Sequence, residues 1–283
     1  MRGLSRSLLQ FVCTVLLGAL LSASLVRFAP GYGMTEDLLD TRLSSLTPID
    51  PAPSLSAYYV QFLAGYVRGD LGQSATLGRP VRDLVAERAP TTLTGVAIGL
   101  TLAWTASSLL SFTSLYSPAL SLSLTAISAG ILQCVPAGIV ALLLFLLGWH
   151  SAPGAGLAAG ILVYPRIAQY LMQLIAQAWQ SPHVVHARAK GLTEWRVFLR
   201  HVLPVCAPQL LSLLGLSLIL SLGALIPVEA ILDVPGIGQL AWQAALARDL
   251  NLLVNITVLI TALVTCSNLL LELCGNALRG EVR

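Results

Sequence analysis

The chain alternates between long uncharged apolar runs and short charged segments. Asp, Glu, Lys and Arg are absent from all 77 residues between Arg88 and Arg166. One helix of that length would exceed roughly three bilayer thicknesses, because a helix rises ~1.5 Å per residue and the hydrocarbon layer is ~30 Å thick. Divided at the Ser-Pro pair 117–118 and the polar turn 150–154, the runs predict six membrane spans, roughly at residues 8–28, 91–113, 119–147, 156–178, 204–228 and 251–275.

The composition agrees with an all-α membrane protein. Apolar residues make up 56% of the chain and charged residues 10%, against about 25% charged residues in a soluble domain. Small residues such as Thr92, Thr94 and Gly95 allow membrane helices to approach closely. This composition excludes a disordered chain, a disulfide scaffold and an ordinary soluble enzyme.

The apolar runs also predict the domain organisation. We expect an N-terminal transmembrane helix at residues 1–28, an extracytoplasmic segment at 29–90 and a core of five transmembrane helices at 91–283. Arg2 and Arg6 before the first run are compatible with a signal peptide, but the length of that run favours a retained anchor.

The distribution of charge predicts that both termini are cytoplasmic. In that arrangement the cytoplasmic segments have an excess of five basic residues, and the outer segments have an excess of three acidic ones. Counts of Lys and Arg alone are nearly equal on the two sides. The orientation rule gives most weight to short loops, and a long segment such as 27–88 crosses regardless of its charge.

The loop at residues 183–203, between the fourth and fifth predicted spans, is the most basic part of the chain. We expect two short helices with a bend at Gly191 and with Thr193 as the cap of the second helix. Such a loop could dock into a groove of another protein or rest on anionic lipid, and the residues alone favour neither.

Residues 187–192 (Ala-Arg-Ala-Lys-Gly-Leu) and 197–204 (Val-Phe-Leu-Arg-His-Val-Leu-Pro) resemble the coupling loop of binding-protein-dependent ABC importer permeases, above all the dipeptide, oligopeptide and nickel permeases. Further similar motifs follow in the family's order over nearly the whole chain. They lie at residues 27–31, 66–74, 78–81, 87–93, 228–229, 234–240, 247–249 and 268–270.

The resemblance implies a permease subunit that forms half of a translocation pathway for peptides or similar small solutes in a bacterial inner membrane. Its implied partners are a second homologous permease subunit, two ATPase subunits, an extracytoplasmic substrate-binding protein and membrane lipid, with no nucleic acid. ATP and Mg would be bound by the ATPase subunits, and this chain would hold no cofactor. The implied ATPase contact consists of Ala187, Arg188, Ala189, Lys190, Gly191, Leu192, Trp195 and Phe198.

Two further sets of residues are candidates for contact with substrate or binding protein. Arg166 would lie within a span, where a charge usually faces a cavity or a partner. The external loop at residues 229–250 has turn-forming and acidic residues that could reach a docked binding protein, namely Glu229, Asp233, Pro235, Gly236 and Gly238.

The chain lacks the sequence patterns of a phosphate-binding loop, a catalytic triad and a metal site, so we expect neither an enzyme nor a metalloprotein. His183, His186 and His201 are expected on the surface of the basic loop. Two other classes remain open, an ion-coupled secondary transporter and a non-transporting membrane scaffold. The first would need acids inside the membrane, and Glu272 is the single candidate.

Overall fold

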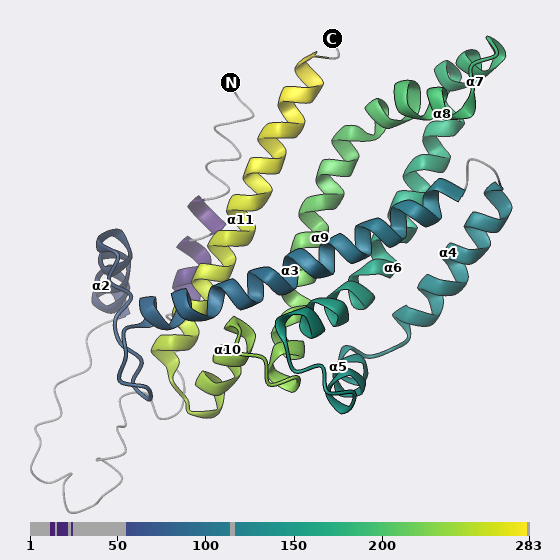
Figure 1. Ribbon diagram of the computed structural model, residues 1–283. Coiled ribbons are helices and arrows are strands. Elements are labelled where there is room, and N and C mark those ends of the chain that lie inside the picture. Colours follow the sequence, from purple (N-terminus) through teal and green to yellow (C-terminus); the bar gives the residue numbers. More distant parts are fainter. Residues whose placement is uncertain (1–11, 15, 22–23, 25–54, 114–116, 282–283) are drawn as a thin grey trace, which may run out of the picture. The chain divides into compact units, whose positions relative to one another are not determined.

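The computed structural model describes residues 12–14, 16–21, 24, 55–113 and 117–281, and the regular elements among them are helices (Figure 1). The predicted all-α class is therefore confirmed. The helices from residue 55 onward are α2 (Leu55–Arg68), α3 (Val81–Phe112), α4 (Pro118–Gln133), α5 (Ala137–Leu146), α6 (Ala152–Trp179), α7 (Pro182–Ala189), α8 (Glu194–Val197), η3 (Phe198–Val202), α9 (Leu203–Ile231), α10 (Ile237–Leu246) and α11 (Leu250–Glu281).

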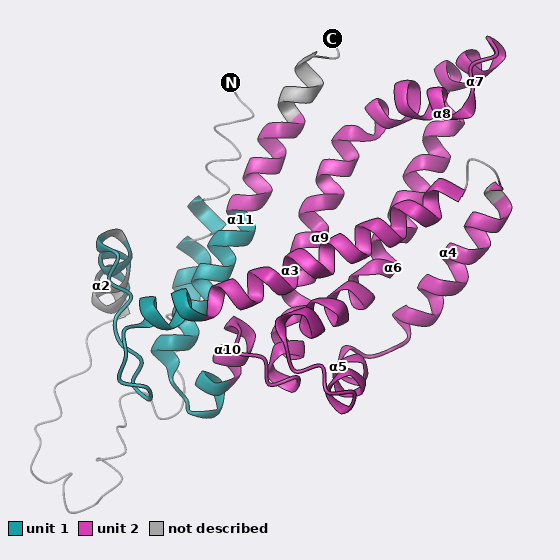
Figure 2. Ribbon diagram, in the orientation of Figure 1, with its two compact units in different colours: residues 1–87, 243–265 teal, residues 88–242, 266–283 magenta. Residues whose placement is uncertain are grey.

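Contacts divide the chain into two compact units (Figure 2). The first comprises residues 1–87 and 243–265, and the second comprises residues 88–242 and 266–283. Helices α3, α10 and α11 each contribute residues to both units. The domain boundaries at residues 28 and 90 stay predictions.

Within the part of the chain that the structure describes, three helical stretches are long and apolar enough to cross a membrane, namely Val81–Phe112, Glu194–Ile231 and Leu250–Gly275. The pair α4–α5 makes a fourth if it is counted as one span. Helix α6, which covers the predicted span 156–178, is not among them, and its C-terminal half carries Arg166 and several glutamines. Much of the predicted span 8–28, and the motif at 27–31, lie outside the described residues. The count of six spans therefore stays a prediction.

The predicted helix at 119–147 is wrong as a continuous element. Helices α4 and α5 are bent by 82° at the break between them. Pro136 is the N-cap of α5, and its backbone is extended, with φ −60° and ψ 142°. A proline also disfavours helical backbone in the residue before it, so the chain leaves the helix at this point.

In the second unit, α6 packs against α9, α4 and α5. Helix α3 approaches α6 through paired glycines. A Cβ on Gly99 would lie 2.9 Å from the carbonyl oxygen of Gly156, and a Cβ on Gly156 would lie 2.8 Å from the Cβ of Ile98. The expected close approach through small residues is thus realised by two Gly-x-x-x-Gly sequences, at 95–99 and 156–160.

Helix α9 continues backwards into η3 and α8 without a break. Residues Phe198–Val202 of η3 form a π-helix, in which backbone hydrogen bonds reach back five residues instead of four. The junction between the basic loop and the fifth predicted span is therefore a widened turn of a single helical path.

In the first unit, the start of α11 packs on the N-terminal helix. Ala19, Val254 and Val258 form the buried cluster. The Tyr66 hydroxyl donates a hydrogen bond to Asn255 Oδ1 (2.7 Å), and Asn255 Nδ2 donates to the carbonyl oxygen of Leu71 (3.1 Å). These bonds fix the motif at residues 66–74 to α11.

Candidate functional site

Residues 182–203, here called the elbow, contain α7, α8 and η3 and lie at the ends of α6 and α9 (Figure 1). Pro182 occupies the first turn of α7, where its missing N–H removes no helical hydrogen bond. Gly191 has φ +76°, a left-handed conformation that glycine adopts without strain. Thr193 is the N-cap of α8, but its side chain makes no capping hydrogen bond. The structure therefore has the predicted bend at Gly191, whereas the predicted side-chain cap does not form.

An apolar cluster holds the elbow on the ends of α6 and α9. It consists of Ala178, Val184, Ala187, Val197, Val202 and Cys206. Ala187 is only 4% exposed, so it packs inside the elbow, whereas Ala189 and Lys190 are exposed. Leu192 and Phe198 are partly buried against the same cluster. The predicted contact residues thus divide into an inner set that shapes the elbow and an outer set available to a partner.

Arg188 connects the two arms of the elbow across the bend at Gly191. Its Nε and Nη2 donate hydrogen bonds of 3.0 and 2.7 Å to Glu194 Oε1. The guanidinium also lies 5.6 Å from the ring centroid of Trp179. The charge of Arg188 is therefore balanced inside the elbow by Glu194, unlike that of Lys190 nearby, for which the described residues provide no ion pair.

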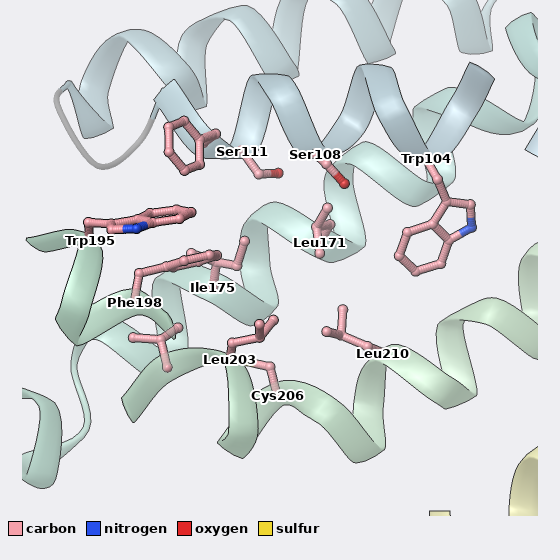
Figure 3. A pocket seen from close by; sticks show the side chains of 12 residues that line it. Trp104, Ser108, Ser111, Leu171, Ile175, Trp195, Phe198, Leu203, Cys206 and Leu210 are labelled. Atoms are coloured by element: carbon pink, nitrogen blue, oxygen red, sulfur yellow. The ribbon is translucent and has the colours of Figure 1, made fainter. Parts of the chain in front are cut away.

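An apolar cavity of about 250 Å³ lies between the elbow and helices α3, α6 and α9 (Figure 3). Its wall at the elbow is aromatic. The ring of Phe112 lies 5.3 Å from that of Trp195 and 6.3 Å from that of Phe198, edge to face in both pairs. Leu171 of α6 and Leu210 of α9 line the cavity as well. The aromatic cluster thus connects the elbow to the C-terminal end of α3.

The turn between α9 and α10, predicted as part of an external loop, is held by polar contacts within the second unit. Glu229 lies in the last turns of α9 and is 1% exposed. Its Oε2 accepts a hydrogen bond from the N–H of Gly238 (2.7 Å) at the start of α10. The hydroxyl oxygen of Thr92 accepts another from the N–H of Ile237 (2.8 Å). Glu229 is therefore a buried support of the turn, and its predicted place in a contact with a binding protein stays a prediction.

The remaining predicted residues of this turn shape it. Asp233 has φ +54° and accepts a hydrogen bond from Gln239 Nε2, and Gln239 Oε1 accepts one from Arg88 (2.9 Å). A Cβ on Gly238 would lie 2.6 Å from backbone atoms of Ile226. The glycine at 238 is therefore required by close packing of α10 on α9, and the predicted loop 229–250 is largely helical.

The sequence of residues 129–282, more than half of the chain, matches the family described as binding-protein-dependent transport system inner membrane component. The matched part includes the elbow and the α9–α10 turn. The chain belongs to this family of membrane permeases. An oligopeptide transport system permease protein, OppB, of Escherichia coli is 32% identical over 145 residues, which cover 46% of this chain and 47% of the relative. This permease thus spans about half the length of the curated Escherichia coli relatives that it matches.

Longer but weaker similarities link the permease to proteins of Brucella. One protein of Brucella abortus, with the provisional name of a peptide transport system permease, is 27% identical over 260 residues and covers 79% of this chain and 78% of the relative. A protein of Brucella suis with the same kind of provisional name is 26% identical over 238 residues, with 75% of each chain covered.

Arg166 of the permease lies on α6 directly after Pro165. Its neighbours Pro165 and Ile167 are buried, while Arg166 itself is exposed on the second unit. The structure does not bring it together with the elbow residues or the α9–α10 turn, and its predicted role in the pathway remains a prediction. Among the described residues of the permease, no group of three or more metal-ligating side chains occurs.

A polar network in the first unit joins two of the motifs, and none of its members was predicted to have a functional role. Asp249 is 1% exposed and precedes α11, where its Oδ1 accepts a hydrogen bond from the N–H of Leu252 (3.1 Å). Its Oδ2 accepts hydrogen bonds from the hydroxyl of Ser74 and from both the N–H (3.2 Å) and the hydroxyl (2.9 Å) of Thr76. An aspartate immediately before a long apolar run is typical of a helix N-cap, so the capping role of Asp249 could have been predicted from the local sequence.

The environment of Asp249 favours its charged form. Burial by itself raises the pKa of this carboxyl group, but the hydrogen bonds from Ser74, Leu252 and Thr76 outweigh burial and hold the pKa below its ordinary value. Asp249 is therefore a structural carboxylate that caps α11 and anchors the loop after α2.

Proposed function

We propose that this chain is the membrane subunit of an ATP-driven importer and forms half of the pathway for peptides or similar small solutes. The second half would come from a homologous permease subunit. Two ATPase subunits would bind and hydrolyse ATP with Mg, and this chain would hold no cofactor. An extracytoplasmic substrate-binding protein would deliver the solute. The names of the relatives support peptides as the solute class.

The observation that carries this proposal is the construction of the elbow. A protein that converts ATPase movement into helix movement needs a rigid body at the contact, since a flexible loop would absorb the displacement. The elbow has its own apolar cluster, a charge pair across its bend and aromatic contacts with α3. A force on its outer surface would therefore reach α3, α6 and α9 together.

The topology of the proposed subunit follows from charge and hydropathy. We propose six spans with both termini in the cytoplasm of a bacterial cell, so that the elbow is cytoplasmic and the α9–α10 turn is external. The exposed residues of the turn would be available to the binding protein. Glu229, which is buried, would hold the turn in shape. Arg166 would face the pathway, where its charge would suit a peptide carboxylate.

The test is purification of the tagged chain in mild detergent, followed by identification of its partners and measurement of uptake in proteoliposomes. We expect two ATPase subunits and a second permease to be recovered. A Gly191→Pro variant should retain ATP hydrolysis and lose uptake, because proline cannot adopt the positive φ at the bend. Recovery of the chain alone, from a preparation that keeps a known importer intact, would favour a secondary transporter or a scaffold.

A further inference from the structure

One side of helix α6 carries polar side chains along the second half of the helix. They follow one another at alternating spacings of four and three residues, which keeps them within an arc of roughly 80° around the helix axis. All of them are exposed on the second unit. We call this side the polar face of α6, and its residues are Arg166, Tyr170, Gln173, Gln177 and the C-cap Gln180.

Toward the N-terminus of α6 the same side of the helix is covered by α3. Ala159 lies on this side, about two turns before Arg166, and it is buried. A Cβ on Gly99 of α3 would lie 3.1 Å from the Cβ of Ala159. From Arg166 onward the side is open, whereas Ile167 and Leu171 on other sides of α6 belong to a buried cluster. The second half of α6 is therefore anchored by its other sides and leaves the polar face uncovered.

The side chains of the polar face have no partners in the part of the chain that the structure describes. Within that part, none of them takes part in a hydrogen bond or an ion pair. Polar neighbours on adjacent sides of α6 are paired. The Tyr164 hydroxyl lies 2.8 Å from Ser128 Oγ, and Gln169 Oε1 accepts a hydrogen bond from Gln133 Nε2 (3.0 Å). The polar face therefore offers unused donors and acceptors to whatever adjoins it.

Lipid hydrocarbon is an unfavourable neighbour for the polar face. Helix α6 packs along α9, which belongs to a stretch apolar enough to cross a membrane, so the polar face lies at membrane depth. An arginine and several glutamines that faced hydrocarbon would leave polar groups without hydrogen bonds, which is costly. We therefore expect this side of α6 to adjoin water, solute or protein.

The chemistry of the polar face suits a peptide backbone. A glutamine amide has N–H donors and a C=O acceptor, as a peptide bond does. No Asp or Glu lies on the face, and its one charge is that of Arg166 at one end. From Arg166 to Gln180 the chain rises roughly 21 Å, which is the length of about six extended residues. The face is thus long enough for a short peptide and has a cation for one of its ends.

We propose that the polar face of α6 binds the backbone of an extended peptide in transit, with its glutamines and Tyr170 hydrogen-bonding to peptide groups and Arg166 holding the terminal carboxylate. The inference rests on the proposed function, because it specifies which part of the solute this subunit recognises. Side chains of the peptide are not needed for these contacts, so peptides of different sequence would be accepted. With the elbow in the cytoplasm, Gln180 lies nearer the cytoplasm than Arg166 does. The bound peptide would therefore have its amino end toward the cytoplasm.

The first test compares the uptake of two peptide sets by the full complex, with its binding protein, in proteoliposomes. One set consists of tetrapeptides of mixed sequence, and the other is the same set with the terminal carboxylate replaced by an amide. We expect the wild type to take up the carboxylate set faster by about tenfold, as expected of one charge-assisted hydrogen bond. Arg166→Gln should take up both sets equally, and Arg166→Lys should keep part of the preference. A preference imposed by the binding protein alone would be unchanged in Arg166→Gln.

The second test concerns the glutamines. Gln173→Leu with Gln177→Leu removes their hydrogen-bonding groups and nearly keeps their size. We expect the wild type to prefer the tetrapeptide set over the same set N-methylated at its peptide groups, and the double variant to lose this preference. The matched control is Gln133→Leu with Gln169→Leu, which removes a glutamine pair beside the face and should keep the preference. Recovery of the ATPase subunits with each variant identifies those that still assemble.

Each outcome decides between the alternatives. If the wild type takes up no peptide of any set, the proposed peptide transport is overturned and this inference with it. If the wild type transports peptides without either preference, or the variants keep both preferences, only this inference is overturned. A benzophenone side chain at position 173 should cross-link to a transported peptide. Cross-links to the second permease subunit or to lipid alone would mean that the face is an interface, which also overturns the inference.

Discussion

The elbow and the α9–α10 turn are both bends in the second unit that carry glycine, charged residues and a proline, yet they are built in opposite ways. At the elbow the bend glycine, Gly191, has open space around it, and the charges point outward. At the turn Gly238 has no room for a Cβ, and the acid Glu229 is buried under the backbone. Bends with similar residue types can therefore present their charges to solvent in one place and use them to support the fold in another. Burial of the charged residue distinguishes the two.

The largest expected effect is at Glu229. Glu229→Ala removes the carboxylate that accepts the N–H of Gly238 and leaves a cavity, so we expect a loss of about 3 kcal/mol in unfolding free energy. Glu229→Gln retains an acceptor oxygen and should cost only about 1 kcal/mol. Equilibrium unfolding in mixed micelles measures both. Equal losses for the two variants would mean that the charge itself is what the turn requires.

The two glycines provide a direct comparison. Gly238→Ala should lower the free energy of unfolding by about 2–3 kcal/mol, because its Cβ would overlap the backbone of Ile226. Gly191→Ala meets nothing within 4 Å and should cost only about 1 kcal/mol, from the positive φ alone. Thermal unfolding of the purified variants gives the order. A larger loss at Gly191 would contradict the contrast between the bends.

Asp249 extends the comparison to the first unit, where a buried acid also supports the backbone. Asp249→Ala should lower the free energy of unfolding by about 1 kcal/mol, because α11 would lose its N-cap. Because its folded pKa lies below the unfolded value, the stabilisation is fully present above the unfolded pKa and is lost as pH falls through the folded pKa. Thermal unfolding across the acidic range should show a smaller pH dependence in Asp249→Asn than in the wild type. Parallel curves for the two proteins would refute the assignment.

The smallest effect is expected at the exposed ion pair that joins the two arms of the elbow. Arg188 and Glu194 have side chains 54% and 44% exposed. Removing the pair by Arg188→Ala should cost less than about 1 kcal/mol, since exposed ion pairs contribute little. The loss should shrink further in high salt, which screens exposed charges. A loss as large as that of Glu229→Ala would show that the elbow, too, depends on an internal polar support.

Much of the fold was predictable because uncharged apolar runs report directly on long helices. The spans predicted at 204–228 and 251–275 lie within α9 and α11, and the span predicted at 91–113 follows α3 to its end at Phe112. The bend at Pro136 was missed, because a count of uncharged residues is insensitive to one proline. The bend of the elbow was predictable, because its glycine and the residues around it lie close together in the sequence.

The contacts of the two buried acids were harder to predict from the sequence. Glu229 meets Gly238 through a turn that needs a positive φ at Asp233, and no local rule requires this conformation of an aspartate. Asp249 meets Ser74 across 175 residues of chain. The motifs that contain these residues were visible, but which motif contacts which depends on how distant helices pack.

The π-helical turn at Phe198–Val202 has a consequence for which length changes the chain can tolerate. A π-turn accommodates one more residue than the α-helical turn it replaces. Deleting a single residue there would restore ordinary α-helical spacing and leave α8 in nearly the same orientation about the helix axis, because the extra residue lies within the turn. Deleting a residue of regular helix within α9 would instead rotate α8 by roughly 100° relative to the rest of α9. Trp195 would then leave Phe112, and the elbow would lose its aromatic contact with α3. A single-residue deletion should therefore be tolerated in the π-turn and should disable the elbow when it falls within α9.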